Sequence, residues 1–480
     1  MLFSISNFYM ALFFILLCLL MLMIPTYSVL GCFAVVVGKK ASIDGSVLFG
    51  HNEQDGGKRI LNFRAIPRMK HASGDLIRLY RGGTLPEISE TNSFLWAENP
   101  GLEFSDVYIN EWGVAVGSDG CGTKEDSYDE LVARGDIVDG GIGYMLRRLI
   151  IQRAKTAREG IQIAGELLDH FGYSDSGRTL VVADSNEAWM LSLVRGKHWV
   201  AQRVPDDEVV ILPNVHIISE VNLEDTDNFM GAPDIITYAI KRGWYDPASG
   251  KPFSFRDAYN PPTNNFWDVR QWRGQSLITT RTNDISETQQ LPFSAKPDHK
   301  LNVTDVINIL RYHGPKGSLC APETLEGAVF QLRNWMPSEI GCVYWRTSAE
   351  PCTSVLTPWY IGITEVPETY HKPISINEQL SLEHHFNPPE GTFDYDPQHT
   401  WWTFRRLQDM VNSDYQANIK KVREVWDEYE RKLLGDQPVI EDEALKLFSK
   451  DRTKARSYLT NYSKNLAIKA MDMASEMTNP

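Results

Sequence analysis

The first clear pattern in the chain is a short apolar segment that starts at a cysteine. Residues 32–37 (CFAVVV) are apolar without interruption and rich in β-branched side chains, which predicts a buried strand. Asp44-Gly45 is typical of a tight turn, and residues 46–50 then predict the returning strand of a hairpin. Cys32 is therefore predicted to stand at the start of a core strand.

Beyond this hairpin, groups of strands alternate with helices. Two further strands are predicted around the turn Glu111-Trp112-Gly113, and a later group of four is predicted to form an antiparallel meander. The predicted strands are residues 106–110 and 114–118, followed by residues 179–183, 188–193, 199–203 and 209–212. Residues 142–153 and 157–171 have helical periodicity. Helices packed on antiparallel sheets give the α+β class.

The second half of the chain is predicted to end in helices. Residues 252–297, rich in Pro, Asn, Trp and Arg, predict mostly ordered loop, and residues 303–312 a short helix. Residues 414–434, 441–448 and 452–473 are predicted to be helical because charged and apolar residues interleave along them. The chain is thus divided into a leader (1–31), a main domain (32–385) and a helical C-terminal extension packed on it (386–480).

The leader has the pattern of a signal peptide or of an N-terminal anchor. Residues 8–24 are an apolar run of 17 residues, and the first 31 residues hold no Lys, Arg, Asp or Glu. Gly31 places a small residue directly before Cys32, which favours cleavage there and a secreted, lumenal or periplasmic location. If residues 8–24 are not removed, the alternative is a membrane-anchored protein.

Composition narrows the classes of protein and of partner. Of the 480 residues, 42% are hydrophobic and 23% charged, which is ordinary globular usage. The net charge of −14 gives no electrostatic footprint for nucleic acid. The six cysteines form no CxxC pair and have no histidine at metal-ligand spacing, which predicts no zinc site. In an exported chain, one or two disulfides are candidates among Cys121, Cys320, Cys342 and Cys352, with the last two nearest in sequence.

A cysteine that is both the first residue and part of a core strand offers a thiol and a free α-amine. In model compounds the pKa of the amine is about 8 and that of the thiol about 8.5, so the amine can act as base for the thiol. Such a site also needs donors for an oxyanion. Asn52, Asn110 and Asn214 each follow or end a predicted strand, and Arg270 lies in the aromatic-rich loop. Taken singly, each residue type also fits a turn or a surface position.

At this point the sequence resembles a known family. The segment 32–46 (CFAVVVGKKASIDGS) is similar to the opening motif of the dipeptidase A and secernin family of N-terminal-nucleophile (Ntn) hydrolases, in which processing unmasks the cysteine. Further similar segments follow in the same order along nearly the whole mature chain. They are residues 110–115 (NEWGVA), 155–159 (KTARE), 187–189 (EAW), 203–206 (RVPD) and 354–362 (SVLTPWYIG).

The resemblance implies a four-layer αββα sandwich and a cysteine dipeptidase that cleaves short peptides through an acyl-thioester, with no metal or organic cofactor. It implies Cys32 as nucleophile and, through its amine, base, with Asn110 and Asn214 as oxyanion or amine-orienting groups. His51, Asn52 and Arg270 are then the candidates for substrate binding.

The chain departs from the family pattern after its second strand. Relatives usually have Arg-Asn-x-Asp there, whereas residues 51–54 are His-Asn-Glu-Gln. This departure keeps two alternatives open, an acylase or amidase acting on a non-peptide amide and a non-catalytic binding protein on the same fold. A third, lipid attachment at Cys32, would block the amine, and Val29 and Leu30 make a poor lipidation motif.

Overall fold

The computed structural model describes residues 31–56, 59–261, 265–286, 289–314 and 317–478. The leader 1–30, including the apolar run 8–24, lies outside the described residues, while residues 31–480 group into one compact unit. The boundary proposed at residue 385 remains a prediction. Among the described residues, no helix combines the length and apolar character needed to cross a bilayer.

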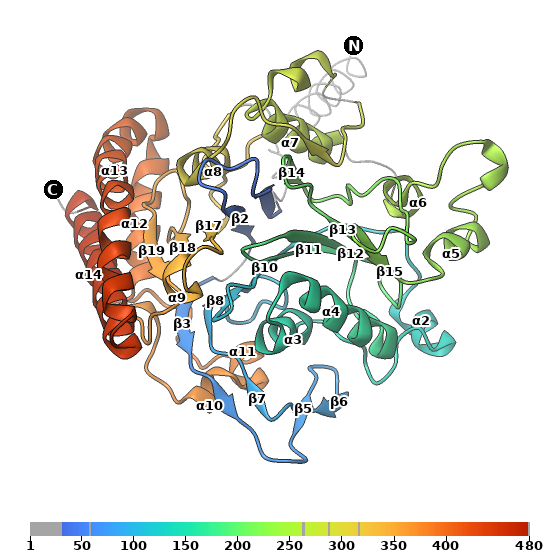
Figure 1. The fold of residues 1–480 in the computed structure, drawn as a ribbon, viewed down its shortest axis with the longest axis horizontal. Helices are drawn as coiled ribbons and strands as arrows, with labels where there is room; N and C mark the ends of the chain where they lie inside the picture. Colours follow the sequence, from blue (N-terminus) through green and yellow to red (C-terminus); the bar gives the residue numbers. More distant parts are fainter. Residues whose placement is uncertain (1–30, 57–58, 262–264, 287–288, 315–316, 479–480) are drawn as a thin grey trace, which may run out of the picture. The chain divides into compact units, whose positions relative to one another are not determined.

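Two antiparallel sheets form the centre of this unit, as counted over the described residues (Figure 1). In spatial order, the seven-stranded sheet is β16 (Ser294–Ala295), β14 (Val209–Leu212), β1 (Phe33–Val37), β2 (Val47–Gln54), β17 (Thr324–Leu332), β18 (Cys342–Arg346) and β19 (Thr357–Tyr360). The eight-stranded sheet is β15 (Phe229–Gly231), β13 (Trp199–Arg203), β12 (Ala188–Leu193), β11 (Arg178–Ala183), β10 (Ala115–Gly120), β9 (Val107–Asn110), β8 (Phe94–Glu98) and β3 (Asn62–Ile66). Two small hairpins pair β4 (Met69–Lys70) with β7 (Glu90–Thr91) and β5 (Leu76–Arg78) with β6 (Thr84–Pro86).

Helices cover the outer faces of both sheets (Figure 1). On the eight-stranded sheet lie α3 (Met145–Arg153) and α4 (Ala157–Phe171), and on the seven-stranded sheet lie α7 (Asn265–Ser276) and α8 (Val303–Leu310). The C-terminal helices α12 (Thr400–Ser413), α13 (Tyr415–Phe448) and α14 (Arg452–Thr478) pack together beside β19. The shorter helices are α2 (Tyr128–Arg134), α5 (Ile235–Lys241), α6 (Phe255–Tyr259), α9 (Ser338–Gly341), α10 (Ile376–Gln379) and α11 (Leu382–Phe386), with 3-10 turns η1 (Pro247–Ser249), η2 (Thr280–Asp284) and η3 (Glu368–Tyr370).

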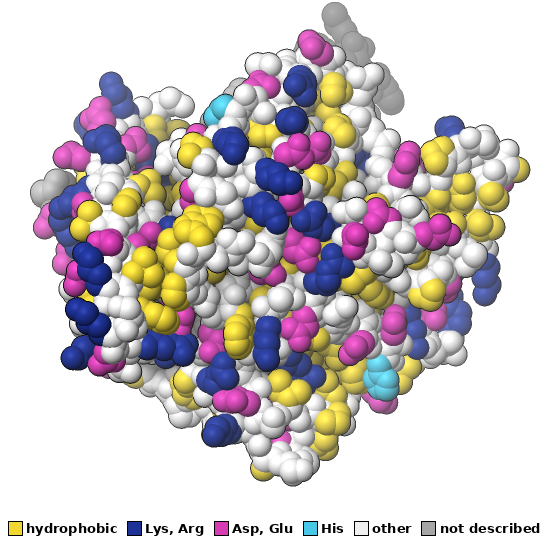
Figure 2. All heavy atoms as spheres, viewed as in Figure 1, with side chains coloured by type: hydrophobic (Ala, Val, Ile, Leu, Met, Phe, Trp, Pro, Cys, Tyr) yellow, Lys and Arg dark blue, Asp and Glu magenta, His cyan; other side chains and the backbone are white. Residues whose placement is uncertain are grey.

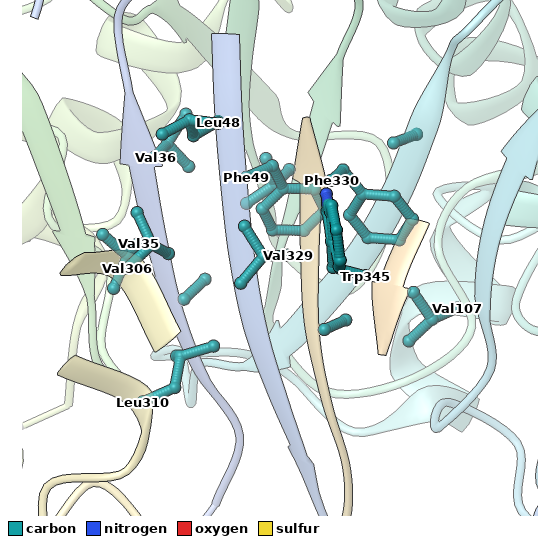
Figure 3. Packing of buried hydrophobic residues seen from close by; sticks show 14 of the residues in the cluster. Val35, Val36, Leu48, Phe49, Val107, Val306, Leu310, Val329, Phe330 and Trp345 are labelled. Atoms are coloured by element: carbon teal, nitrogen blue, oxygen red, sulfur yellow. The ribbon is translucent and has the colours of Figure 1, made fainter. Parts of the chain in front are cut away.

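The two sheets pack face to face. Side chains alternate along each strand, so every second residue points toward the other sheet. A Cβ added to Gly117 of β10 would come within 2.9 Å of the Phe49 ring of β2, so Phe49 faces the other sheet. The next residue, Gly50, instead faces α8, where an added Cβ would meet Val306. Figure 3 shows Val306 and Leu310 beside the strands of this sheet, with Phe49 near the stacked ring of Phe330. The order helix, sheet, sheet, helix confirms the predicted αββα sandwich.

Three local predictions were wrong. Residues 209–212 do not extend the meander, because β14 pairs with β1 in the other sheet, and a fully apolar strand does not reveal which sheet it joins. Residues 252–297 include α6 and α7, whose buried face holds polar groups such as Arg270 that hide the apolar stripe. The predicted break near residue 435 is absent, since α13 continues through Pro438.

The surface shows how the charges are spread, and the cysteines correct one more expectation. The face shown in Figure 2 has Lys and Arg interspersed with Asp and Glu, so the acidic excess is not gathered in one patch there. Of the cysteines in the described part of the chain, all five are free thiols, so the candidate disulfides are not formed. Cys342 lies on β18 against Gly113, away from any pairing with Cys352.

A buried ion cluster joins β3 and β8 and makes the free energy of unfolding depend on pH. Arg64 Nε lies 2.6 Å from Glu98 Oε2, and His385 Nδ1 lies 3.4 Å from Oε1. Burial raises the pKa of Glu98, but the charge of Arg64 and the hydrogen bond with His385 lower it by more, to about 2 from its ordinary 4.5. A depressed carboxyl pKa stabilises the fold above the ordinary pKa, and that stability is lost as the pH falls toward 2.

We therefore expect Glu98 to account for a loss of roughly 3 kcal/mol in the free energy of unfolding between about pH 5 and pH 2. Urea titrations at stepped pH would measure it in the natural chain and in Glu98→Gln. The variant should be less stable at neutral pH, because Arg64 loses its partner, yet show a shallower acid slope. Parallel slopes in the two proteins would contradict this assignment.

Candidate active site

The proposed nucleophile lies where the hairpin register brings β2 back to the start of β1. Phe33 pairs with Asn52, so Glu53 stands opposite Cys32. The Cys32 thiol donates to Glu53 Oε1 at 3.0 Å and lies 3.7 Å from the Gln54 carbonyl oxygen. Cys32 is 7% exposed, which places its sulfur inside the sandwich.

The electrostatics around the sulfur oppose a free thiolate. Burial raises the pKa of Cys32 well above its ordinary value, and the charges of Glu53 and Asp119 raise it further. Burial also raises the pKa of Glu53, to about 7, although His51 and the thiol hydrogen bond lower it. With Gly31 still attached, the thiol stays protonated at neutral pH and needs a base.

His51 lies beside the sulfur and is held by an aspartate from the other sheet. His51 Nε2 is 3.0 Å from Asp119 Oδ1, and both side chains are buried. Burial lowers the pKa of His51, but the hydrogen bond and charge of Asp119 outweigh this, so the net shift is upward. Burial raises the pKa of Asp119, although the hydrogen bond from His51 lowers it. The pair places an imidazole and a carboxyl group beside the sulfur, at the point where the sequence departs from the family pattern.

Arg270 of α7 reaches the backbone on both sides of the peptide bond before Cys32. Its Nη1 donates to the carbonyl oxygens of Gly31 at 2.9 Å and Cys32 at 3.3 Å, and its Nη2 donates to Gln54 Oε1 at 3.3 Å. Burial lowers the pKa of Arg270 to about 10, so the guanidinium is still cationic at neutral pH. A positive charge therefore stands against the carbonyl that precedes the thiol.

Asn214 completes this arrangement, because β14 runs antiparallel to β1 and ends beside its start. Asn214 Oδ1 accepts from Arg270 Nη1 at 2.8 Å, and its Nδ2 donates to the Gly120 carbonyl at 3.0 Å. A Cβ added to Gly31 would lie 2.5 Å from Asn214 Nδ2. The amide therefore lies directly against residue 31, where a substrate carbonyl would approach the sulfur.

Two predicted site residues lie elsewhere. Asn52 faces the outer side of the sheet, where its Nδ2 donates to the carbonyls of Leu310 and Leu319 at 2.8 Å each, so it supports a loop and does not face the sulfur. Asn110 lies at the β9–β10 turn, at the opposite end of β10 from Asp119. Its Nδ2 donates to the carbonyls of Ile151 and Ala154 at the end of α3. Its amide therefore holds a turn and is not an oxyanion donor.

Sequence reasoning missed Asp119 and did not settle Glu53. Asp119 lies near the end of a buried strand, in Ser118-Asp119-Gly120. A carboxylate at that position was the signal that could have marked it as a site residue. The donor atoms of Cys32, His51 and Asp119 lie within 4.8 Å of one another, a set that a transition-metal ion can also take. A soft divalent ion bound there would occupy the nucleophile and prevent its attack on a substrate.

A buried thiol with an adjacent acid, a His–Asp pair and convergent hydrogen-bond donors is typical of the active site of a cysteine hydrolase. Residues 31–428 match the family description "Peptidase family C69". A "Probable dipeptidase" of Latilactobacillus sakei is 24% identical over 448 residues, covering 86% of this chain and 88% of its own. A "Dipeptidase" of Bifidobacterium longum is 28% identical over 397 residues, covering 70% and 72%. The chain belongs to peptidase family C69.

Among solved structures, that of a Penicillin V acylase from Agrobacterium tumefaciens is similar over 68% of this chain and 84% of that chain. The sequence identity is 12% and the TM-score is 0.33.

Proposed function

We propose that the chain is a cysteine dipeptidase that becomes active once residues 1–31 are removed and Cys32 is the first residue. The family match begins at residue 31, one residue before the thiol, and the relatives named above are called dipeptidases. The observation that carries the proposal is that Arg270 donates to the carbonyl of Gly31 and that Asn214, its hydrogen-bond partner, lies against the same residue, directly before Cys32.

The free amine of Cys32 supplies the base that the buried thiol lacks. The thiol proton moves to this amine as the sulfur attacks the carbonyl carbon of the peptide bond and an S–C bond forms. The C–N bond then breaks, and the amine returns the proton to the departing amino group. Water attacks the thioester in the same way, gives one proton to the amine and releases the acid and the thiol.

Arg270 and Asn214 act where negative charge develops. A substrate carbonyl attacked by Cys32 takes the place that the Gly31 carbonyl holds in the uncleaved chain, so its oxygen faces Arg270 Nη1. Fixed donors of this kind stabilise the tetrahedral oxyanion without reorganising. The acids Glu53 and Asp119 lie near the sulfur and suit the free ammonium of a short, unblocked peptide.

We further propose that residues 1–31 direct export and are cleaved before Cys32, with a membrane-anchored protein as the alternative. The supporting observation is the uncharged apolar leader followed by a small residue at position 31. A reporter fused after residue 31 would reach the exported fraction if the proposal holds. Retention of the reporter in the membrane fraction would favour the anchor instead.

The activity is tested on the processed protein with a panel of matched substrates. Each unblocked dipeptide is paired with its N-acetyl form and with the N-acyl amide of the same leaving group, and amino acid release is followed. We expect turnover of the unblocked dipeptides and loss of activity on N-acetylation, because the ammonium no longer meets the two acids. Preference for the N-acyl amides would favour the acylase alternative, and no turnover of any substrate would favour the binding protein.

A further inference from the structure

A second cluster of metal-binding side chains lies outside the active site. It consists of His313 and Cys320, which flank the loop after α8, and of Glu350 and Cys352, which follow β18. The ligand atoms of all four lie within 4.8 Å of one another. Two segments about thirty residues apart thus bring together two sulfurs, one imidazole nitrogen and one carboxylate oxygen.

Three of the six separations between these atoms are close to the edges of a tetrahedron. With metal–sulfur bonds of about 2.3 Å and metal–nitrogen or metal–oxygen bonds of about 2.0 Å, tetrahedral coordination separates ligand atoms by about 3.3 to 3.8 Å. His313 Nδ1 lies 3.9 Å from Cys352 Sγ and 3.6 Å from Glu350 Oε1. Cys320 Sγ lies 3.6 Å from the same carboxylate oxygen. These three distances are compatible with four ligands around one ion.

The carboxylate of this cluster is held in place by the C-terminal helices. Asn412 of α12 donates from Nδ2 to Glu350 Oε2 at 2.8 Å, which turns Oε1 toward the sulfurs. Gln408 of the same helix accepts from the Glu350 backbone N–H at 3.2 Å. A ligand whose second oxygen is fixed by an outer hydrogen bond is typical of built metal sites.

The cluster is buried except at its imidazole. Cys320, Glu350 and Cys352 are buried, and His313, with 32% of its side chain exposed, is the group nearest to solvent. Polar groups placed this deep need partners, and one cation could serve all four at once.

We propose that His313, Cys320, Glu350 and Cys352 form a tetrahedral structural site for a zinc-class divalent cation. Two thiolates with an imidazole and a carboxylate suit Zn²⁺ better than the oxygen-preferring Ca²⁺ or Mg²⁺. On binding, both thiols and any protonated carboxyl release their protons to solvent, and four metal–ligand bonds form without a change of oxidation state.

The position of the site gives the cation a structural task. Leu319, next to a ligand, accepts hydrogen bonds at its carbonyl from Asn52 and from Gln54, and Gln54 in turn accepts from Arg270. The ion would therefore link α12 to the segment around Leu319, which supports Gln54 and, through it, Arg270.

The first experiment measures metal content in the purified, processed enzyme by elemental mass spectrometry. We expect about one zinc per chain in the natural protein and in two controls, Cys342→Ser, a buried thiol elsewhere, and Cys32→Ser, which removes the other thiol of a possible ion site. Cys352→Ser should lose the zinc. Loss of the zinc in Cys32→Ser but not in Cys352→Ser would overturn the proposal, because the ion would then belong to the active site.

A second measurement tests the proposal even if Cys352→Ser does not fold. The natural protein is stripped with a chelator and titrated with Co²⁺, which should give the intense visible bands and sulfur charge-transfer bands of tetrahedral thiolate coordination. His313→Ala, which changes the partly exposed ligand, should weaken Co²⁺ binding at least about tenfold. A mass lower by two hydrogens with a Cys320–Cys352 disulfide, or no uptake of either ion, would overturn the proposal.

Discussion

Cys32→Ser is expected to lose dipeptidase activity by at least about a thousandfold, because the hydroxyl is a far weaker nucleophile than the thiol and is much harder for the α-amine to deprotonate. The change replaces one sulfur with an oxygen and keeps a donor for the hydrogen bond to Glu53, so the fold should hold. The measurement is kcat/KM on the best dipeptide, with the melting temperature taken in parallel. An unchanged melting temperature then assigns the loss to chemistry.

The matched control for this variant is Cys342→Ser. Cys342 is also a buried free thiol, and it lies on β18 of the same sheet. We expect this control to keep the activity of the natural enzyme. Full activity in Cys32→Ser, or equal losses in the two variants, would sink the assignment of Cys32 as nucleophile.

Asn214→Ala is expected to lower kcat by about a hundred- to a thousandfold, the usual cost of removing one oxyanion donor. Its amide presses on residue 31 and accepts from Arg270, so its loss removes a donor and frees the guanidinium at the same point. Because the interaction strengthens in the transition state, KM should change little. Steady-state kinetics on the processed enzyme separate the two parameters.

Asn110→Ala is the contrasting variant. Its side chain holds the β9–β10 turn and the end of α3, so we expect a lower melting temperature with kcat unchanged in the folded protein. A large fall in kcat for Asn110→Ala at unchanged stability would restore the role that the sequence suggested for it. A rise in KM with kcat unchanged for Asn214→Ala would remove that residue from the oxyanion site.

Much of the fold could be predicted because local patterns decide it. The strand from residue 33 and its return follow from apolar runs around Asp44-Gly45, although β2 continues beyond the predicted residue 50 to Gln54, and α4 is found with its predicted bounds. Pairing between distant strands could not be predicted, as β14 shows, since a strand buried on both faces fits either sheet. The helix α7 was missed because its inner face is lined with Arg270 and Gln271 in place of apolar residues.

The site was predictable only where a motif names the residue. Cys32 stands in such a motif, and Asn214 and Arg270 were found as donors near strand ends or aromatic residues. Asn110 and Asn52 share those features, but the direction of a side chain depends on register, and both point away from the sulfur. Asp119 and the second cluster at His313 depend on contacts between segments far apart in sequence, which spacing rules do not detect.

Intact mass spectrometry of the natural protein, with sequencing of its N-terminal peptide, tests the central claim most directly. The account predicts a mature chain that starts at Cys32 with an unmodified α-amine, and every step of the proposed chemistry uses that group. A chain that still begins at Met1, or a Cys32 whose amine is acylated, would contradict it.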